Sequence, residues 1–182
     1  AYQTAYLKTY YPAQFMAAML NSFLGNLDKI PVYVDECRKI GVEILKPDIN
    51  KSFTKFTVEG NKIRFGLGSI KNVGIAAVDV IVSEREKNGE FLDFGDFAER
   101  IYGESVNKKC IESLIKAGAF DVFGKTRSTL IASFETILDT VGYSKSRGNE
   151  NQVSMFDLYT DDNVLQKIKY EYIELPEYDH KE

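Results

Sequence analysis

The residues best suited to binding chemistry form the run Ile70-Lys71-Asn72-Val73-Gly74, which precedes an apolar stretch from Ile75 onward. An apolar residue, any residue, a glycine, a second apolar residue and a glycine are typical of the turn in a helix-hairpin-helix motif, and here Asn72 replaces the first glycine. Such a turn needs a residue that tolerates positive φ, and Asn72 tolerates it better than most residues. The turn and the next helix N-terminus direct backbone N–H groups outward, where a phosphate can accept them. With the charge of Lys71, the run predicts a contact to the sugar–phosphate backbone that carries no sequence information. The DNA-binding candidates here are Lys71, Asn72, Val73 and Gly74.

A second, more degenerate copy of the pattern follows about forty residues later. Ile111, Leu114 and Ile115 predict the face of a first helix, residues 116–120 the turn, and Thr126 onward the second helix. The stretch has a local net charge of +2, and its DNA-binding candidates are Lys108, Lys109, Lys116, Gly118, Lys125 and Arg127. A helix–turn–helix pair with a solvated charged face is the alternative for either copy alone. Two copies together favour binding of duplex DNA.

A third signal is the peptide Gln152-Val153-Ser154-Met155-Phe156, which lies in a polar stretch. Exposed Met and Phe side chains reduce solubility unless they meet a partner. In an extended peptide they can enter a partner's pocket while Gln152 forms hydrogen bonds at its rim. The alternative is that Met155 and Phe156 fold back onto the domain.

Several other kinds of chemistry are excluded by the residues. Gly66-Leu67-Gly68 lacks the third glycine of a dinucleotide fingerprint and the Gly-Lys-Ser/Thr of a P-loop. His180 is the single histidine, so no Ser-His-Asp or Cys-His relay can form around it. The two cysteines, Cys37 and Cys110, match no disulfide or zinc pattern and fit a reducing compartment. No apolar run has the roughly 18 residues that a membrane span needs.

The net charge of −4 over 182 residues argues against a DNA-binding protein only when it is taken as a whole. Residues 157–182 contain eight acidic residues and three lysines, a net charge of −5. The remaining residues carry 20 basic and 19 acidic side chains, a net charge of +1. The acidity therefore belongs mainly to the C-terminal tail.

The elements that must position these residues are mostly helices. Apolar residues at three- and four-residue spacing predict helices over residues 2–25 (two, interrupted at Pro12), 27–40, 75–86, 94–101, 107–117 and 126–141. Alternating residues predict a strand at 42–45 and a β-hairpin with strands at 53–58 and 62–67. Residues 143–151 have the composition of a linker, and little fixed structure is expected beyond Leu158. The predicted fold class is mostly α with a small β-hairpin.

The chain resembles the C family of bacterial replicative DNA polymerases. The resemblance rests on Tyr2 to Lys8 running into Tyr11-Pro12, Gly41 through Asn50, Ile63 to Leu67, Ile70 to Gly74, and Glu112 to Asp121, in the same order. It spans about residues 1–158 and indicates a piece of a longer protein. It implies the C-terminal part of the polymerase fingers at 1–50, a tandem helix-hairpin-helix domain with its β-hairpin at 51–142, and a flexible linker with an acidic tail at 143–182.

The resemblance also implies a function. The expected role is noncatalytic: sequence-independent binding of the duplex primer-template, and contact with the sliding clamp through Gln152, Ser154, Met155 and Phe156. Polymerases of this family hold Mg²⁺ on palm aspartates, which have no counterpart here, so no catalytic residue, metal ligand or cofactor is assigned to this chain. The remaining polymerase domains are expected partners, no membrane is, and the expected location is the bacterial cytoplasm.

Two rival functions are weighed against this one. A protein-interaction module would use only the peptide at 152–156 and the acidic tail. A helix-hairpin-helix DNA glycosylase would need a catalytic aspartate beyond the hairpin, for which Asp93 and Asp96 are the candidates, but no base-flipping pocket is indicated.

Overall fold

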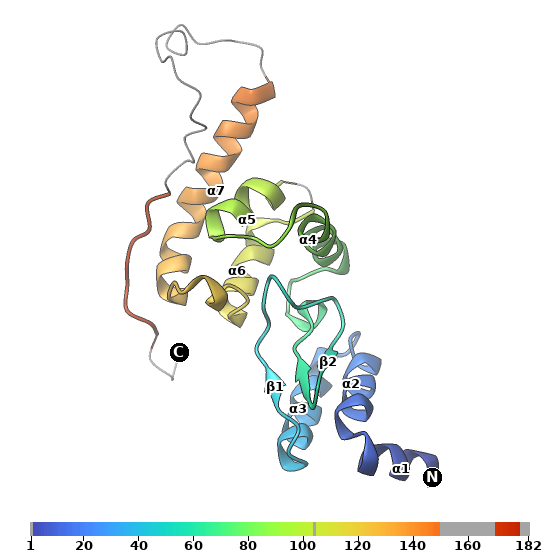
Figure 1. Cartoon of the computed structure of the whole chain (residues 1–182). Coiled ribbons are helices and arrows are strands. Elements are labelled where there is room, and N and C mark those ends of the chain that lie inside the picture. The colour runs from blue at the N-terminus through green and yellow to red at the C-terminus, as the bar shows by residue number, and fades with distance from the viewer. Residues whose placement is uncertain (1, 104, 150–169, 179–182) are drawn as a thin grey trace, which may run out of the picture.

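The computed structural model describes residues 2–103, 105–149 and 170–178. The described chain is mostly helical with one small sheet, which confirms the predicted fold class (Figure 1). The elements are α1 (Tyr2–Tyr10), α2 (Pro12–Ser22), the 3-10 helix η1 (Leu27–Lys29), α3 (Ile30–Lys39), β1 (Ile44–Leu45), β2 (Thr57–Glu59), β3 (Lys62–Arg64), the 3-10 helix η2 (Leu67–Ser69), α4 (Ile75–Asn88), α5 (Phe94–Ile101), α6 (Lys108–Ala117), the 3-10 helix η3 (Asp121–Phe123) and α7 (Arg127–Asn149).

Helices α2 and α3 and the sheet share one hydrophobic cluster, to which α1 contributes no side chain. Pro12 occupies the first turn of α2, where its missing N–H costs nothing, so the chain breaks between α1 and α2 as predicted. The sheet has the order β1-β3-β2, with β1 parallel and β2 antiparallel to β3. Phe56 and Ile63 pack in the same cluster as Met16, Leu20 and other side chains of α2 and α3. The β-hairpin therefore packs with the N-terminal helices, although the expected boundary at 50/51 groups it with the later ones.

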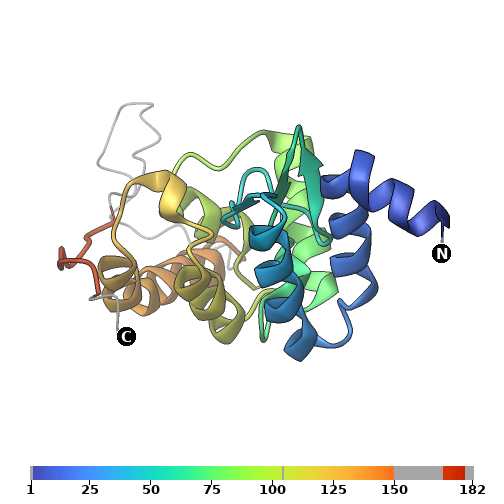
Figure 2. The same ribbon diagram turned by 90° about the horizontal axis from the view of Figure 1, so that it is seen from below.

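A second hydrophobic cluster joins α4, α5, α6 and α7 (Figure 2). The rings of Phe94, Phe97 and Phe120 meet one another at its centre, with the centroids of Phe97 and Phe120 4.9 Å apart. Ile49 and Leu67 also belong to this cluster. The residues just before and just after the β-hairpin therefore pack in the second cluster, although the hairpin itself packs in the first. Burial of this apolar surface fixes α6 against α4 and α7, and thereby brings the two predicted hairpins close to one another.

Helix α7 is longer than predicted. It continues to Asn149, beyond the expected end at about Val141 and into the residues expected to form a linker. The glycines in this stretch disfavour a helix only mildly, and no proline removes a backbone hydrogen bond. Lys145 also donates a hydrogen bond to the Tyr102 carbonyl oxygen at 2.8 Å, which ties the last part of α7 to the end of α5.

Residues 170–178, called here the return segment, also differ from expectation. They form an extended chain that runs alongside α7 in the opposite direction (Figure 1). Tyr170 and Tyr172 pack against the second cluster, and the Tyr170 hydroxyl donates to Glu99 at 2.6 Å. Composition alone predicted a solvated tail, but two tyrosines provide enough apolar contact to hold this part of it. Within the described residues, no helix has the length and apolar character to cross a membrane.

Candidate nucleic-acid interface

The first predicted hairpin adopts the expected backbone conformation. Asn72 has φ +65°, and it is the one residue other than glycine with positive φ in the described chain. Val73 is buried in the second cluster, so its side chain anchors the turn while its neighbours remain exposed. The short helix expected before the turn is the single 3-10 turn η2.

The N-terminus of α4 is open to the surface. Gly74 is its N-cap residue, and no side chain among the described residues accepts a hydrogen bond from the first turn. Ile75, the first helical residue, is 64% exposed. The first N–H groups of a helix have no partner within it and carry partial positive charge, so this end of α4 can receive an anion.

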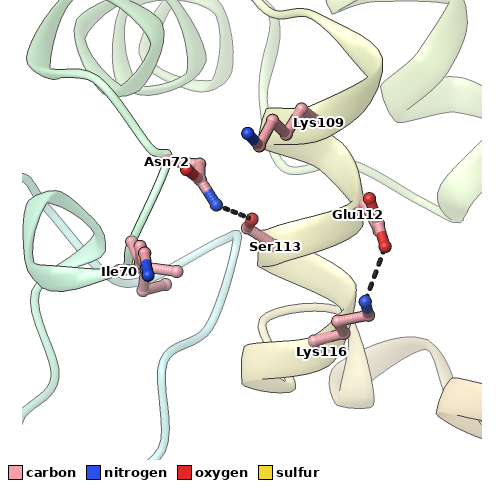
Figure 3. A pocket seen from close by; sticks show the side chains of 7 residues that line it. Ile70, Asn72, Lys109, Glu112, Ser113 and Lys116 are labelled. Carbon is pink, nitrogen blue, oxygen red and sulfur yellow. Dashed lines mark hydrogen bonds and ion pairs between the residues drawn. The ribbon is translucent and has the colours of Figure 1, made fainter.

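A pocket of about 390 Å³ lies between the first hairpin and α6 (Figure 3). Asn72 reaches across it and donates a hydrogen bond from Nδ2 to Ser113 Oγ at 3.3 Å. Lys71 and Ile70 line the pocket from the hairpin side, and Lys109, Glu112, Ser113 and Lys116 line it from α6. Positions 109, 113 and 116 recur at helical spacing on one face of α6, and that spacing was the signal by which Ser113 could have been found from sequence.

The pocket carries an excess of positive charge. Lys116 forms an ion pair with Glu112 at 2.6 Å, the one acidic side chain that lines the pocket. Lys71 and Lys109 form no ion pair with any other described residue. Two exposed ammonium groups on opposite walls are therefore available to a phosphate, which accepts several donors at once.

The second predicted turn is held by Arg127. Its Nε and Nη2 donate to the two carboxylate oxygens of Asp121 at 3.0 and 2.7 Å, and its Nη1 donates to the Lys116 carbonyl oxygen at 3.3 Å. Burial by itself would raise the pKa of the Asp121 carboxyl, but the hydrogen bonds and charges of Arg127 and Lys46 lower it. Gly118 ends α6 with φ +82°, and a Cβ there would lie 2.2 Å from Arg127 Nη2. Gly118 and Arg127 thus fix the path from α6 to α7.

Two further predicted lysines point away from the pocket. Lys108 pairs with Asp139 of α7 at 2.7 Å, and this hydrogen bond raises the pKa of the lysine. Lys125 pairs with Glu174 of the return segment at 3.3 Å, and its Nζ lies 5.1 Å from the centre of the Tyr172 ring. The six predicted cations therefore do not share one face: Lys71, Lys109 and Lys116 line one pocket, and Lys108, Lys125 and Arg127 pair with carboxylates elsewhere.

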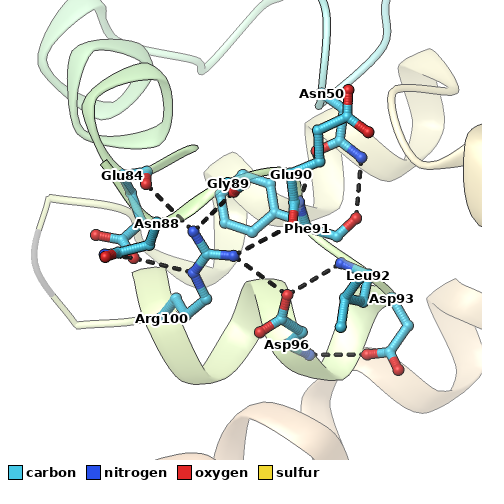
Figure 4. Close-up of polar contacts among 10 residues, drawn as sticks. All are labelled: Asn50, Glu84, Asn88, Gly89, Glu90, Phe91, Leu92, Asp93, Asp96 and Arg100. Atoms are coloured by element: carbon cyan, nitrogen blue, oxygen red, sulfur yellow. Dashed lines mark hydrogen bonds and ion pairs between the residues drawn. The ribbon is translucent and has the colours of Figure 1, made fainter. Parts of the chain in front are cut away.

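The other residues singled out from sequence have structural roles. A Cβ on Gly66 would lie 2.6 Å from the Lys55 carbonyl carbon, so the Gly-x-Gly pair permits a close approach of two backbone segments. Asp93 accepts a hydrogen bond from the Asp96 N–H at 2.8 Å and caps α5 (Figure 4). Asp96 accepts from the Leu92 N–H and from Arg100. Neither aspartate lines the lysine pocket.

Sequence reasoning missed Arg100, which joins α4 to α5. Its guanidinium donates to Glu84 and Asp96 and to the carbonyl oxygens of Glu84, Gly89 and Glu90, and it lies 4.5 Å from the centre of the Phe91 ring (Figure 4). The sequence indicates the ion pair between Asp96 and Arg100, because the two residues are four positions apart on a helix. The contacts of Arg100 with Glu84 and the carbonyl oxygens depend on tertiary structure.

Two expectations have no structural test. Gln152, Ser154, Met155 and Phe156 lie outside the described residues. In the part of the chain that is described, no three His, Cys, Asp or Glu side chains form a group that could hold a metal ion.

Comparison with known proteins gives consistent matches. A sequence model of the helix-hairpin-helix motif matches residues 41–130, which include both predicted turns. The DNA polymerase III alpha subunit of Borreliella burgdorferi is 43% identical over 172 residues, which are 94% of this chain and 15% of that relative. The alpha subunit of Thermus aquaticus is 44% identical over 156 residues, and that of Vibrio cholerae 38% over all 182. The chain covers 13% and 16% of the lengths of these two relatives.

Proposed function

The chain belongs to the family of bacterial DNA polymerase III alpha subunits, and on that premise we propose that it binds the backbone of duplex DNA without reading base sequence. The observation that carries the proposal is the pocket that Lys71 lines from the first hairpin and Lys109 from α6, together with the open N-terminus of α4, whose N-cap residue Gly74 follows Lys71 by three positions. Ammonium groups and helical N–H groups bind phosphate oxygens, which are the same for every base. The DNA would be the primer-template of the polymerase.

The proposed role is noncatalytic. No residue of this chain is assigned to phosphoryl transfer, because the palm aspartates that hold Mg²⁺ in polymerases of this family have no counterpart in its sequence. We propose that the Mg²⁺ chemistry belongs to other domains of the polymerase, which would be partners of this one in the bacterial cytoplasm. Weak DNA binding by this chain is then enough to support processivity, because its linkage to those domains raises the effective concentration of DNA near it.

The DNA-binding proposal is tested by removing both unpaired lysines together. Lys71→Ala/Lys109→Ala should weaken duplex binding on the order of tenfold at low salt. The slope of log K against log salt concentration should fall by about 1.8, since each phosphate contact contributes about 0.9. Fluorescence anisotropy with two duplexes of unrelated sequence measures both quantities, and the two duplexes should bind equally.

The matched control is Lys39→Ala/Lys87→Ala, which removes the same charge from two exposed lysines that form no ion pair with a described residue. Lys87 is twelve residues from the start of α4, or about 18 Å along the helix. An equal loss of affinity in the control would show that net charge alone acts. Wild-type binding that does not change with salt would overturn the phosphate contact.

We also propose that the peptide with Gln152, Ser154, Met155 and Phe156 docks on the polymerase sliding clamp. The resemblance of these four residues to the family's clamp-binding motif supports this step, together with the physical expectation that Met and Phe enter an apolar pocket. Clamp contact and DNA contact would then use different parts of the chain.

Met155→Ala/Phe156→Ala should reduce clamp binding at least tenfold and leave duplex affinity unchanged, because two anchor side chains are lost and no lysine is altered. Surface plasmon resonance on immobilised clamp measures the first quantity. Val164→Ala/Leu165→Ala, also outside the described residues, is the control and should retain clamp binding. Clamp binding without any duplex binding would instead favour a protein-interaction module.

A further inference from the structure

The second hairpin is covered by the chain's own acidic segment. Helix α7 begins at Arg127, and its N-terminus faces the return segment, residues 170–178. The Glu177 carboxylate accepts a hydrogen bond from the Arg127 backbone N–H, with Oε2 3.0 Å from the nitrogen. This N–H lowers the pKa of Glu177. A carboxylate therefore occupies the kind of position in which a helix N-terminus binds a phosphate.

A second carboxylate covers the neighbouring cation. Glu174 lies 3.3 Å from the Nζ of Lys125, which is two residues before the start of α7. Lys125 is a predicted DNA contact, so the return segment places negative charge on both features that the second hairpin would offer to a DNA backbone. At the first hairpin, by contrast, no side chain caps α4, and Lys71 has no described ion-pair partner.

The rest of the contact is polar, and the hydroxyl residues of α7 that take part in it, Ser128, Thr129 and Ser133, are buried. The Thr126, Ser128 and Thr129 hydroxyls donate to the Leu175 carbonyl oxygen, and Ser128 also donates to that of Pro176. In the other direction, the Leu175 N–H donates to Thr129 Oγ1 at 2.8 Å, and the Ile173 N–H to Ser133 Oγ at 2.8 Å. These hydroxyls can equally donate to phosphate oxygens.

Little apolar surface holds the acidic end of the segment in place. Ile173 is 57% exposed, Leu175 42% and Tyr178 45%. Exposed ion pairs contribute little free energy and are screened by salt. The acidic end is therefore held mainly by hydrogen bonds and exposed ion pairs, and phosphate oxygens can replace its oxygens as acceptors on α7. Tyr170 and Tyr172, packed on the second cluster, can keep the segment tethered.

We propose that the acidic end of the return segment is an intramolecular competitor of DNA, which covers a second backbone-binding surface made of Lys125, the N-terminus of α7 and the Thr126 and Ser128 hydroxyls. The proposal rests on the proposed DNA-binding function and extends it. A duplex that reaches the second hairpin displaces Glu174 and Glu177 and puts phosphates in their places. The segment thereby weakens binding by the isolated hairpins and favours duplexes long enough to engage both.

The first test removes the two competing carboxylates from the 182-residue chain. Glu174→Gln/Glu177→Gln should tighten duplex binding about threefold to tenfold, and the salt slope should become steeper by about 0.9 for each new phosphate contact. Glu171→Gln/Glu86→Gln is the matched control, because both residues are exposed and neither side chain forms an ion pair with a described residue. Equal tightening in the control, or none in the test variant, would overturn the proposal.

The second test follows displacement directly by amide hydrogen exchange. The Ile173 and Leu175 amides should exchange faster when duplex DNA saturates the chain, because they lose Ser133 and Thr129 as acceptors. The Ile63 amide, bonded to the Glu43 carbonyl oxygen in the sheet, should not change. Unchanged or slower exchange at 173 and 175 would refute competition.

The two proposals fail in different ways. If Lys71→Ala/Lys109→Ala weakens duplex binding but removal of the carboxylates has no effect, competition is wrong and the first pocket stands. If the wild-type chain and the Gln variant both fail to bind duplex DNA, the DNA-binding function and the competition are both overturned.

Discussion

Asn72 shows how one residue can serve both a turn and a surface. Its φ of +65° closes the first hairpin, and its side-chain amide reaches Ser113 on α6. An Asn tolerates this backbone region because its short polar side chain can form local hydrogen bonds. The conformation was predictable from the motif, but the partner was not, because Ser113 is 41 residues away in the chain.

Asn72→Gly should therefore leave the free energy of unfolding within about 0.5 kcal/mol of wild type, whereas Asn72→Val should lower it by about 1–2 kcal/mol. Glycine accepts positive φ, and a β-branched residue does not. Urea denaturation measures both values. Lys71→Val is the control, because Lys71 is exposed and does not have positive φ. If Lys71→Val and Asn72→Val lower the free energy of unfolding equally, backbone strain at positive φ does not explain the effect at residue 72.

At the scale of elements, the joint between α4 and α5 depends on Arg100. Its guanidinium is only 16% exposed and is held by two carboxylates and three backbone carbonyl oxygens. Lysine has the same charge but lacks the planar fork that reaches several acceptors at once. This contact fixes α4 relative to α5 in the second cluster. Helix α6, which carries the pocket lysines Lys109 and Lys116, packs in the same cluster.

Arg100→Lys should consequently lower the free energy of unfolding by about 2 kcal/mol, since several partly buried acceptors lose their donor. The control is Arg38→Lys, whose pair with Asp35 is exposed on both sides and contributes roughly 0–1 kcal/mol. Thermal unfolding followed by circular dichroism compares the two variants. If Arg100→Lys lowers the midpoint temperature of unfolding no more than Arg38→Lys does, the guanidinium group of Arg100 does not have the proposed role.

At the scale of the whole molecule, the contribution of a carboxylate to stability depends more on its hydrogen-bond and ion-pair partners than on the net charge of the chain. Several carboxyl groups have pKa values lowered by hydrogen-bond donors, some of them near in the chain and some distant, among them Glu36, Glu59, Glu84, Asp121 and Glu177. A pKa that is lower in the folded than in the unfolded state stabilises the fold above the unfolded value. That stabilisation is lost as the pH falls through the folded value.

The urea midpoint should accordingly be constant near neutral pH and fall as the pH drops below about 4.5, the usual value for glutamate. Glu59→Gln/Glu84→Gln should be less stable than wild type at pH 7, because Arg64 loses its carboxylate partner and Arg100 loses one of its two. At pH 3 the difference should narrow, since protonation removes the same charges from the wild-type chain. Parallel curves from pH 7 to pH 3 would contradict the lowered pKa values.

Much of the molecule follows from local patterns. Helix starts at Pro12 and Asn107, the β-hairpin at Gly60 and the turns at Asn72 and Gly118 all depend on residues a few positions apart. The ends were less predictable: α7 extends to Asn149 because tertiary contacts, such as that of Lys145 with Tyr102, supplement a weak local preference. The expected clamp peptide and domain boundaries remain predictions.

The sequence by itself determined the helical class, the two hairpins, the separation of an acidic tail from a near-neutral body, and the family. Only the tertiary structure decided which charges are available. Lys71 and Lys109 remain without a described ion-pair partner in one pocket, whereas Lys125 meets Glu174 and Arg127 meets Asp121. The physical reason is that local preference depends on neighbours in the chain, whereas the partner of a charge is set by packing between distant segments, such as the return segment against α7.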